Sequence, residues 1–134
     1  MTSEGVGGDL GGDPACWAGV ADDERALVVD LGPRLEEPGD GVHWTLEPDS
    51  QLNTNLVRLD PGHSIGEHTN DEVDVIIVVL AGAGHVLLDG RHVPVRPHTL
   101  VHAPTGAARS IHAGDSGLSY LTVHRRRPRG LTIG

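Results

Sequence analysis

The feature that most restricts the fold is a succession of short apolar runs, each ended by glycine, proline, aspartate or asparagine. Runs of this length between turn residues are typical of β-strands, and no stretch keeps the 3.6-residue apolar period of a helix. We therefore predict an all-β chain. The expected strands are Ala26–Leu31, Val42–Glu47, Leu52–Leu59, Ser64–Thr69, Val73–Leu80, His85–Leu88, His92–Val95, Thr99–Ala103, Ala107–His112 and Leu118–His124.

Turn residues indicate how these strands follow one another. Asp89-Gly90 is a two-residue type I′ hairpin sequence, since both positions must tolerate a positive φ. Ten short strands at regular spacing predict an antiparallel sandwich or barrel. A chain of 134 residues is the size of one domain, and we assign residues 25–126 to it. Residues 1–24 are acidic and glycine-rich and are expected to form a flexible tail, and residues 127–134 a short C-terminal tail.

Composition argues against several classes of function. The chain carries 10 basic and 19 acidic residues, a formal charge of −9, which is the wrong sign for binding a nucleic-acid backbone. The longest apolar run, Val75 to Ala81, is far shorter than the roughly 20 residues that span a membrane as a helix. Cys16 is the only cysteine and no secretory signal pattern opens the chain, so we expect a cytoplasmic protein. We also expect a homodimer, in which N-terminal strands extend a sheet and cover its edge.

Two segments of the chain resemble a known family. In the first, Gly62 and His68 have the spacing of the first cupin motif, which reads Gly, five residues, His-x-His, three or four residues, Glu, about six residues and Gly. In the second, Pro104 and Gly106 match the Pro-x-Gly of the second cupin motif. Residues 40 to 124 therefore resemble a small single-domain cupin. This resemblance implies an antiparallel jelly-roll β-barrel.

The resemblance also implies a metal site, and most of its ligands are replaced here. Cupins typically hold a divalent ion with the two His and the Glu of the first motif and the His of the second, all facing into the barrel. Of these only His68 is unchanged. Asn70 stands for the second His, Val75 for the Glu with Asp74 one place earlier, and Arg109 for the last His.

Arg109 argues against the usual metal. A guanidinium stays protonated, offers no lone pair and repels a divalent cation. Because a charge buried in a barrel needs a partner, we expect a carboxylate to pair with Arg109 in the structural place of the ion. The candidate carboxylates are Asp74, Glu72 and Glu67. We accordingly expect no cofactor.

Three functions fit these residues. The first is binding a small polar or anionic molecule in the barrel, or simple acid/base chemistry on it, with Arg109 as an anion clamp. The other ligand-binding residues would be His68, Asn70, Glu72 and Asp74. The second is a metal-dependent oxygenase or isomerase, with Zn, Mn, Fe or Ni held by His68, by Asp74 or Glu72, and by a relocated histidine. The third is a non-catalytic sensor or interaction module without a ligand-sized cavity.

Other polar groups have plainer interpretations. A relocated metal site would draw on His63, His85, His98, His102 and His112, most of which we expect to be solvated. The basic run Arg125 to Arg129 is interpreted as a solvated terminus or a partner for the acidic N-terminal half. Gly114-Asp115-Ser116-Gly117 matches the tetrapeptide around the nucleophile of trypsin-like proteases. The chain is too short for the two barrels of those enzymes, however, and the same residues make an ordinary hairpin turn.

Overall fold

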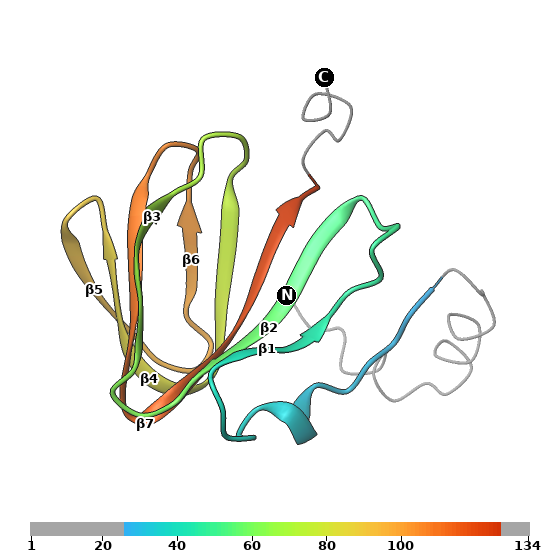
Figure 1. Cartoon of the computed structure of the whole chain (residues 1–134), viewed down its shortest axis with the longest axis horizontal. Helices are drawn as coiled ribbons and strands as arrows, with labels where there is room; N and C mark the ends of the chain where they lie inside the picture. Colours follow the sequence, from blue (N-terminus) through green and yellow to red (C-terminus); the bar gives the residue numbers. More distant parts are fainter. Residues whose placement is uncertain (1–25, 127–134) are drawn as a thin grey trace, which may run out of the picture. The chain divides into compact units, whose positions relative to one another are not determined.

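The computed structural model describes residues 26–126, which form seven strands and one short 3-10 turn (Figure 1). The elements are η1 (Gly32–Arg34), β1 (Gly41–Thr45), β2 (Leu52–Leu59), β3 (Ser64–Thr69), β4 (Val75–Leu88), β5 (Arg91–Val95), β6 (Leu100–Ala103) and β7 (Ala108–Arg125). No helix in this range is long and apolar enough to cross a membrane. The tails expected at residues 1–24 and 127–134 lie outside the described residues.

The two longest strands, β4 and β7, organise the barrel. All strand pairs are antiparallel, in the order β1-β2-β7-β4-β5, with β3 also paired to β7 and β6 to β4. The first half of β7 pairs with β3 and its second half with β2, while β4 pairs first with β6 and then with β5. Both strands bend in Figure 1, so that their halves belong to different walls. The antiparallel jelly-roll β-barrel is thus confirmed.

Two of the predicted breaks between strands are wrong. Most of Val73–Leu80, from residue 75 on, and all of His85–Leu88 belong to one strand, β4. Likewise Ala107–His112, from residue 108 on, and Leu118–His124 belong to β7. The segment Gly114–Gly117, interpreted as a hairpin turn, therefore lies inside a strand.

Glycine accounts for this error, because here it permits a close crossing rather than a turn. A Cβ on Gly82 would lie 2.1 Å from the carbonyl oxygen of Gly117, and a Cβ on Gly84 would lie 2.0 Å from that of His112. The pairing of β4 with β7 shifts register between Val79 and Ala81 and again between Gly82 and Gly84. The glycines thus mark bulges at which two long strands cross in contact.

The predicted strand Ala26–Leu31 is also wrong, since residues 26–31 form no strand. The side chains of Leu27 and Val28 are 58% and 56% exposed. The apolar sequence of this segment, with its adjacent valines, suits a strand, yet these residues adopt no strand structure. Strand propensity alone was therefore misleading.

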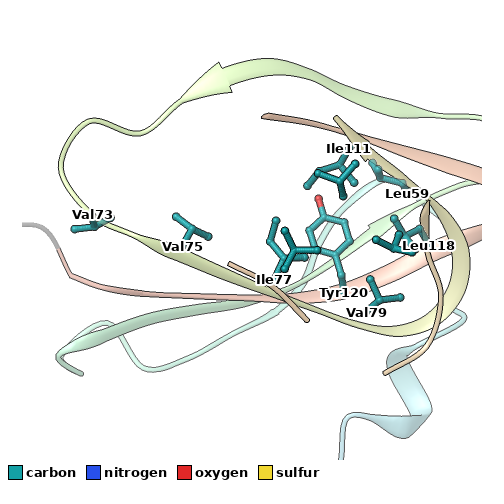
Figure 2. Close-up of a cluster of buried hydrophobic side chains, with 11 residues drawn as sticks. Leu59, Val73, Val75, Ile77, Val79, Ile111, Leu118 and Tyr120 are labelled. Carbon is teal, nitrogen blue, oxygen red and sulfur yellow. The ribbon is translucent and has the colours of Figure 1, made fainter. Parts of the chain in front are cut away.

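The hairpin between β4 and β5 and the core agree with the sequence. Asp89 and Gly90 have φ values of 50° and 80°, as a type I′ turn requires. Aliphatic side chains and one aromatic ring fill the barrel, and Figure 2 shows Tyr120 among Ile77, Ile111 and Leu118. Burial alternates along the first part of β4, so one of its faces points toward this core, whereas β7 contains two runs of consecutive buried residues, 109–111 and 117–120.

Candidate functional site

A cavity of about 250 Å³ opens into the barrel beside the apolar core. Its aliphatic wall consists of Val57, Ile65, Val75, Ile77 and Ile111, and its polar lining of His68, Thr69, Asn70, Arg109, Tyr120, Thr122 and His124. Three residues singled out from the sequence, His68, Asn70 and Arg109, are therefore brought together.

His68 and Arg109 lie opposite each other on the adjacent strands β3 and β7. They are Cα partners in the antiparallel pair of β3 with β7, so their side chains emerge on the same face. Arg109 is buried, with 8% of its surface exposed, whereas His68 is exposed. The cavity thus has a fixed positive charge in its wall and an imidazole at its solvent side.

Asn70 supports the backbone at the end of β3. Its side-chain oxygen accepts hydrogen bonds from the backbone N–H groups of Glu72 at 3.0 Å and Val73 at 3.1 Å. This is the way in which asparagine commonly shapes a turn. The amide oxygen is therefore committed to the loop, and the NH2 group is what Asn70 has left to offer a ligand.

Three polar cavity residues on β7 were missed by the sequence interpretation, as was Thr69 on β3. Tyr120, Thr122 and His124 alternate along β7 with the apolar Leu121 and Val123. Burial raises the pKa of the Tyr120 phenol, although the positive charge of Arg109 opposes the shift. Tyr120 therefore stays neutral, and its hydroxyl can donate a hydrogen bond. The period of two in this polar pattern was the available signal.

Glu72 and Asp74, also expected at the site, line a different hollow. It is a groove of about 490 Å³ that shares only His124 with the barrel cavity, and its other walls come from Leu52, Val73, Ile76, His102, Thr105, Val123 and Arg125. The loop from residue 70 to residue 74 carries Asn70 in the barrel cavity, whereas Glu72 and Asp74 line the groove.

Asp74 ties this loop to the turn that follows β6. Its Oδ1 accepts hydrogen bonds from the backbone N–H and the hydroxyl of Thr105, both at 2.8 Å, and its Oδ2 lies 3.1 Å from Nε2 of His102. The Thr105 hydrogen bonds, followed by that of His102, lower the pKa of Asp74 to about 2. A second bond between the loops runs from the backbone N–H of Gly106 to the carbonyl of Asn70, at 2.8 Å.

The contacts of Asp74 with Thr105 and His102 predict that the stability of the fold decreases at acidic pH. Its pKa is depressed from 3.8 in the unfolded chain to about 2 in the folded protein. The stabilisation is therefore present above about pH 4 and is lost as the pH falls toward 2. We expect Asp74→Asn to unfold at a lower urea concentration than wild type at pH 7, with the difference shrinking between pH 5 and pH 2. A difference that does not change over this range would contradict the assignment.

The residues at the cupin metal positions do not fit a divalent ion. Val75 has no donor atom, the Asn70 oxygen accepts two backbone N–H groups, and Arg109 places a cation in the cavity wall. No carboxylate is found among the described residues that line this cavity. Among the four cupin ligand positions, only His68 offers a ligand of the kind that Zn or Fe prefers.

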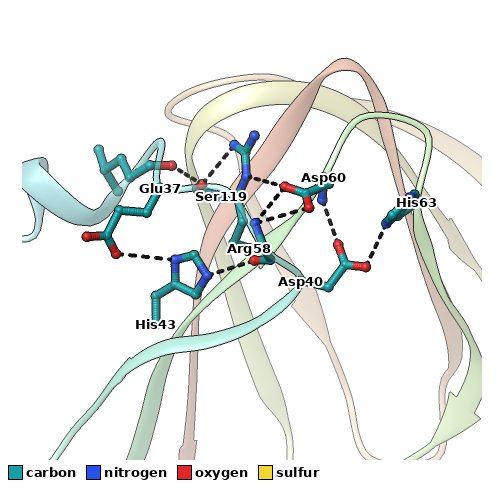
Figure 3. Close-up of polar contacts among 9 residues, drawn as sticks. Glu37, Asp40, His43, Arg58, Asp60, His63 and Ser119 are labelled. Atoms are coloured by element: carbon teal, nitrogen blue, oxygen red, sulfur yellow. Dashed lines mark hydrogen bonds and ion pairs between the residues drawn. The ribbon is translucent and has the colours of Figure 1, made fainter.

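A second group of potential metal ligands lies beside the C-terminal end of β2. Oxygens of Asp40 and Asp60 and a ring nitrogen of His63 lie within 4.8 Å of one another (Figure 3). Asp40 accepts hydrogen bonds from the Asp60 backbone N–H at 2.8 Å and is 2.6 Å from His63 Nδ1, and these contacts lower its pKa.

Asp60 in this group is held by its own partners. Both of its oxygens accept from the Gly39 N–H at 3.0 Å, and Nε of Arg58 lies 3.5 Å from Oδ1. Arg58 is itself buried and donates to the Ser119 hydroxyl at 3.4 Å, and Ser119 donates to the Leu35 carbonyl (Figure 3). The oxygens are thus occupied and a guanidinium is close, which favours a structural link between segment 35–40 and β2 over a cation site.

Comparison with known proteins agrees with the barrel. A family model described as the cupin domain matches residues 55–124, which is 70 of 134 residues. A search of curated proteins finds no match. Among solved structures, a cupin superfamily protein from Desulfitobacterium hafniense is 19% identical, with a TM-score of 0.62 over 77% of this chain and 92% of that one.

Two further structures are similar and bear functional names. KdgF from Halomonas sp. is 20% identical, with a TM-score of 0.59 over 66% of this chain and 80% of that chain. A predicted oxalate decarboxylase from Thermotoga maritima is 26% identical, with a TM-score of 0.54 over 56% of this chain and 67% of that chain.

Proposed function

Because the chain belongs to the cupin family, we propose that its barrel binds a small organic anion, held by Arg109 in place of a metal ion. The observation that carries this proposal is the charge of the cavity. In a chain with a net charge of −9, the barrel cavity is lined by a buried arginine and two histidines and by no described carboxylate. A guanidinium with its fork of donors is suited to a carboxylate or phosphate.

The dimensions of the cavity restrict the ligand. Its volume of about 250 Å³ is below the roughly 300–1,000 Å³ of typical drug-sized sites. The aliphatic wall suits a short carbon skeleton, while Asn70, Tyr120 and Thr122 supply polar groups for a second ligand substituent. His68 is the group best placed for proton transfer if the ligand also reacts. A cavity of this kind favours ligand binding over a module closed by an internal ion pair.

A titration that excludes metal tests the proposal. The full chain, freed of metal with a chelator, is titrated by calorimetry with acetate, pyruvate, succinate and inorganic phosphate in the presence of EDTA. We expect at least one of these anions to bind with a stoichiometry of one per barrel, and its affinity to be the same with and without EDTA. Binding that requires added Zn, Mn, Fe or Ni would favour the metal-dependent enzyme instead.

The homodimer remains a proposal, supported by the segment Ala26–Leu31. It carries exposed Leu27 and Val28 and forms no strand within the described range. An apolar extended segment of this kind is suited to pair with an edge strand of a second copy. Sedimentation of the full chain tests this, and a monomer at tens of micromolar would contradict it.

A further inference from the structure

The only tyrosine of the chain lies in the barrel with an unused hydroxyl group. Tyr120 is 1% exposed and lines the barrel cavity. No residue in the described range forms a hydrogen bond with its hydroxyl. Figure 2 shows the hydroxyl directed toward Ile111, another residue of the cavity wall. Buried polar groups are nearly always paired, so an unpaired one in a cavity points to a partner that enters from outside.

The Tyr120 hydroxyl is unpaired but not sealed off. Among the described residues, the side-chain polar atoms that are fully enclosed without a hydrogen bond are Nδ1 of His43 and Nε of Arg58. The Tyr120 oxygen is not one of them, so it keeps a small open surface although the residue as a whole is buried. Because Tyr120 lines the cavity, that surface is where a ligand in the barrel meets it.

Other polar groups of the cavity are less dependent on a ligand. The side-chain oxygen of Asn70 accepts two backbone N–H groups. His68 is exposed, and its Nδ1 lies 3.2 Å from the carbonyl oxygen of Gly66, while Thr122 is only half-buried. A ligand that leaves a donor unpaired costs most where water cannot replace it. Tyr120 is therefore the group in this set that discriminates most sharply between ligands.

Tyr120 and Arg109 reach the cavity from different parts of β7. Arg109 lies in the half of the strand that pairs with β3, and Tyr120 lies in the half that pairs with β2. Burial raises the pKa of the phenol, and the charge of Arg109 opposes this shift, so the guanidinium is close enough for the phenol to sense it. A ligand whose carboxylate lies at Arg109 can thus extend along aliphatic side chains such as Ile111 toward the Tyr120 hydroxyl.

We propose that Tyr120 donates a hydrogen bond to a neutral oxygen of the ligand, and that this ligand is a short monocarboxylate bearing a hydroxyl or oxo group. The inference rests on the anion site proposed at Arg109. A second carboxylate on the ligand could accept the same bond, but away from the guanidinium it would be buried against aliphatic side chains at a high desolvation cost. A hydroxyl or carbonyl oxygen accepts the bond without that cost.

Three pairs of monocarboxylates test the proposal: lactate with isobutyrate, pyruvate with methacrylate, and 3-hydroxybutyrate with isovalerate. Within each pair an oxygen is replaced by a carbon of similar size, while the carboxylate stays the same. Calorimetry of the full chain in EDTA measures the six affinities. We expect wild type to prefer at least one oxygen-bearing acid over its carbon partner by about tenfold or more, since the carbon partner leaves the buried phenol unpaired.

Tyr120→Phe removes only the hydroxyl and should fold as wild type does, because the hydroxyl has no partner in the described part of the protein. We expect the preferred acid to bind about tenfold more weakly to this variant and its carbon partner to bind within about twofold of wild type. The matched control is Ser110→Ala, which removes a buried hydroxyl from β7 outside the cavity and should leave the preference unchanged.

A spectroscopic measurement reports on the hydrogen bond itself. Since the chain has one tyrosine, carbon-13 at Cζ of tyrosine gives a single signal that belongs to Tyr120. We expect the preferred oxygen-bearing acid to shift this signal more than its carbon partner does when each saturates the barrel. If Tyr120 only packs against the ligand, the two acids shift the signal equally.

The outcomes separate the role of Tyr120 from the anion site. A preference that disappears in Tyr120→Phe and persists in Ser110→Ala supports the proposal. Equal affinities within all three pairs, an equal loss of both members in Tyr120→Phe, or a preference that survives in Tyr120→Phe would overturn it and leave the Arg109 site standing. If wild type binds none of the six acids, the anion site fails as well.

Discussion

Replacement of Arg109 by glutamine is expected to lower the affinity of the barrel for its anion by roughly 30- to 150-fold. Hydrogen bonds to a charged group contribute about 2–3 kcal/mol when one partner is removed from a buried site, and Arg109 is 8% exposed in the cavity wall. Calorimetry with the tightest of the small carboxylates measures the change. Arg109→Lys should lose less, because it keeps the charge and loses only the planar fork.

Arg58 offers a matched control for this experiment. It is another buried arginine, 7% exposed, but it lies outside the barrel cavity and contacts Ser119 and Asp60. Arg58→Gln removes the same charge from the same chain and should leave anion affinity within about twofold while lowering stability. If Arg109→Gln binds the anion as wild type does, or if Arg58→Gln loses affinity equally, the clamp is wrong.

Much of the fold follows from local sequence, and the two wrongly predicted breaks inside β4 and β7 have one cause. Turn residues such as Asp89-Gly90 and the alternating apolar pattern placed most of the strands. Glycine has two uses that a sequence does not separate: it allows a positive φ in a turn, and it removes a side chain where two strands touch. At Gly82 both apply, since its φ is 81° and a Cβ there would meet the Gly117 carbonyl.

The sequence predicts the site residues that lie on strands, because a strand fixes the direction of its side chains. It predicts the loop residues less well. His68 and Arg109 sit on paired strands, and both line the barrel cavity as expected. Asp74 lies in a loop, where no period determines direction, and it binds Thr105 and His102 instead. The prediction that Glu72 and Asp74 bind the ligand therefore stays a prediction, and any contribution of theirs comes from the neighbouring groove.

Histidine at positions 70 and 109 together is expected to create a metal site in the barrel. Residue 109 faces His68 across β3 and β7, and residue 70 follows two places along. Asn70→His with Arg109→His would therefore place two further imidazoles beside that of His68 and remove the cation that opposes an ion. We expect the affinity of the cavity for Ni²⁺ or Zn²⁺ to rise by roughly 100-fold or more, since neutral imidazole is a preferred ligand of both.

The gain is measured best in a background without His85, because the stacked rings of His85, His92 and His112 offer other nitrogens to an added ion. With His85→Gln present in every sample, ion uptake reports on the barrel, and calorimetry in a weak chelator gives the affinity. The control, Asn70→His with Arg109→Gln, loses the same positive charge without adding the imidazole that faces His68. Both variants lose the turn contacts of the Asn70 oxygen, so any instability is shared. If the two bind Ni²⁺ equally, charge alone excludes the ion. If neither binds it, the cavity lacks the geometry that its motif positions imply. Stronger binding by the double-histidine variant would identify Arg109 and Asn70 as the residues that keep an ion out of this barrel.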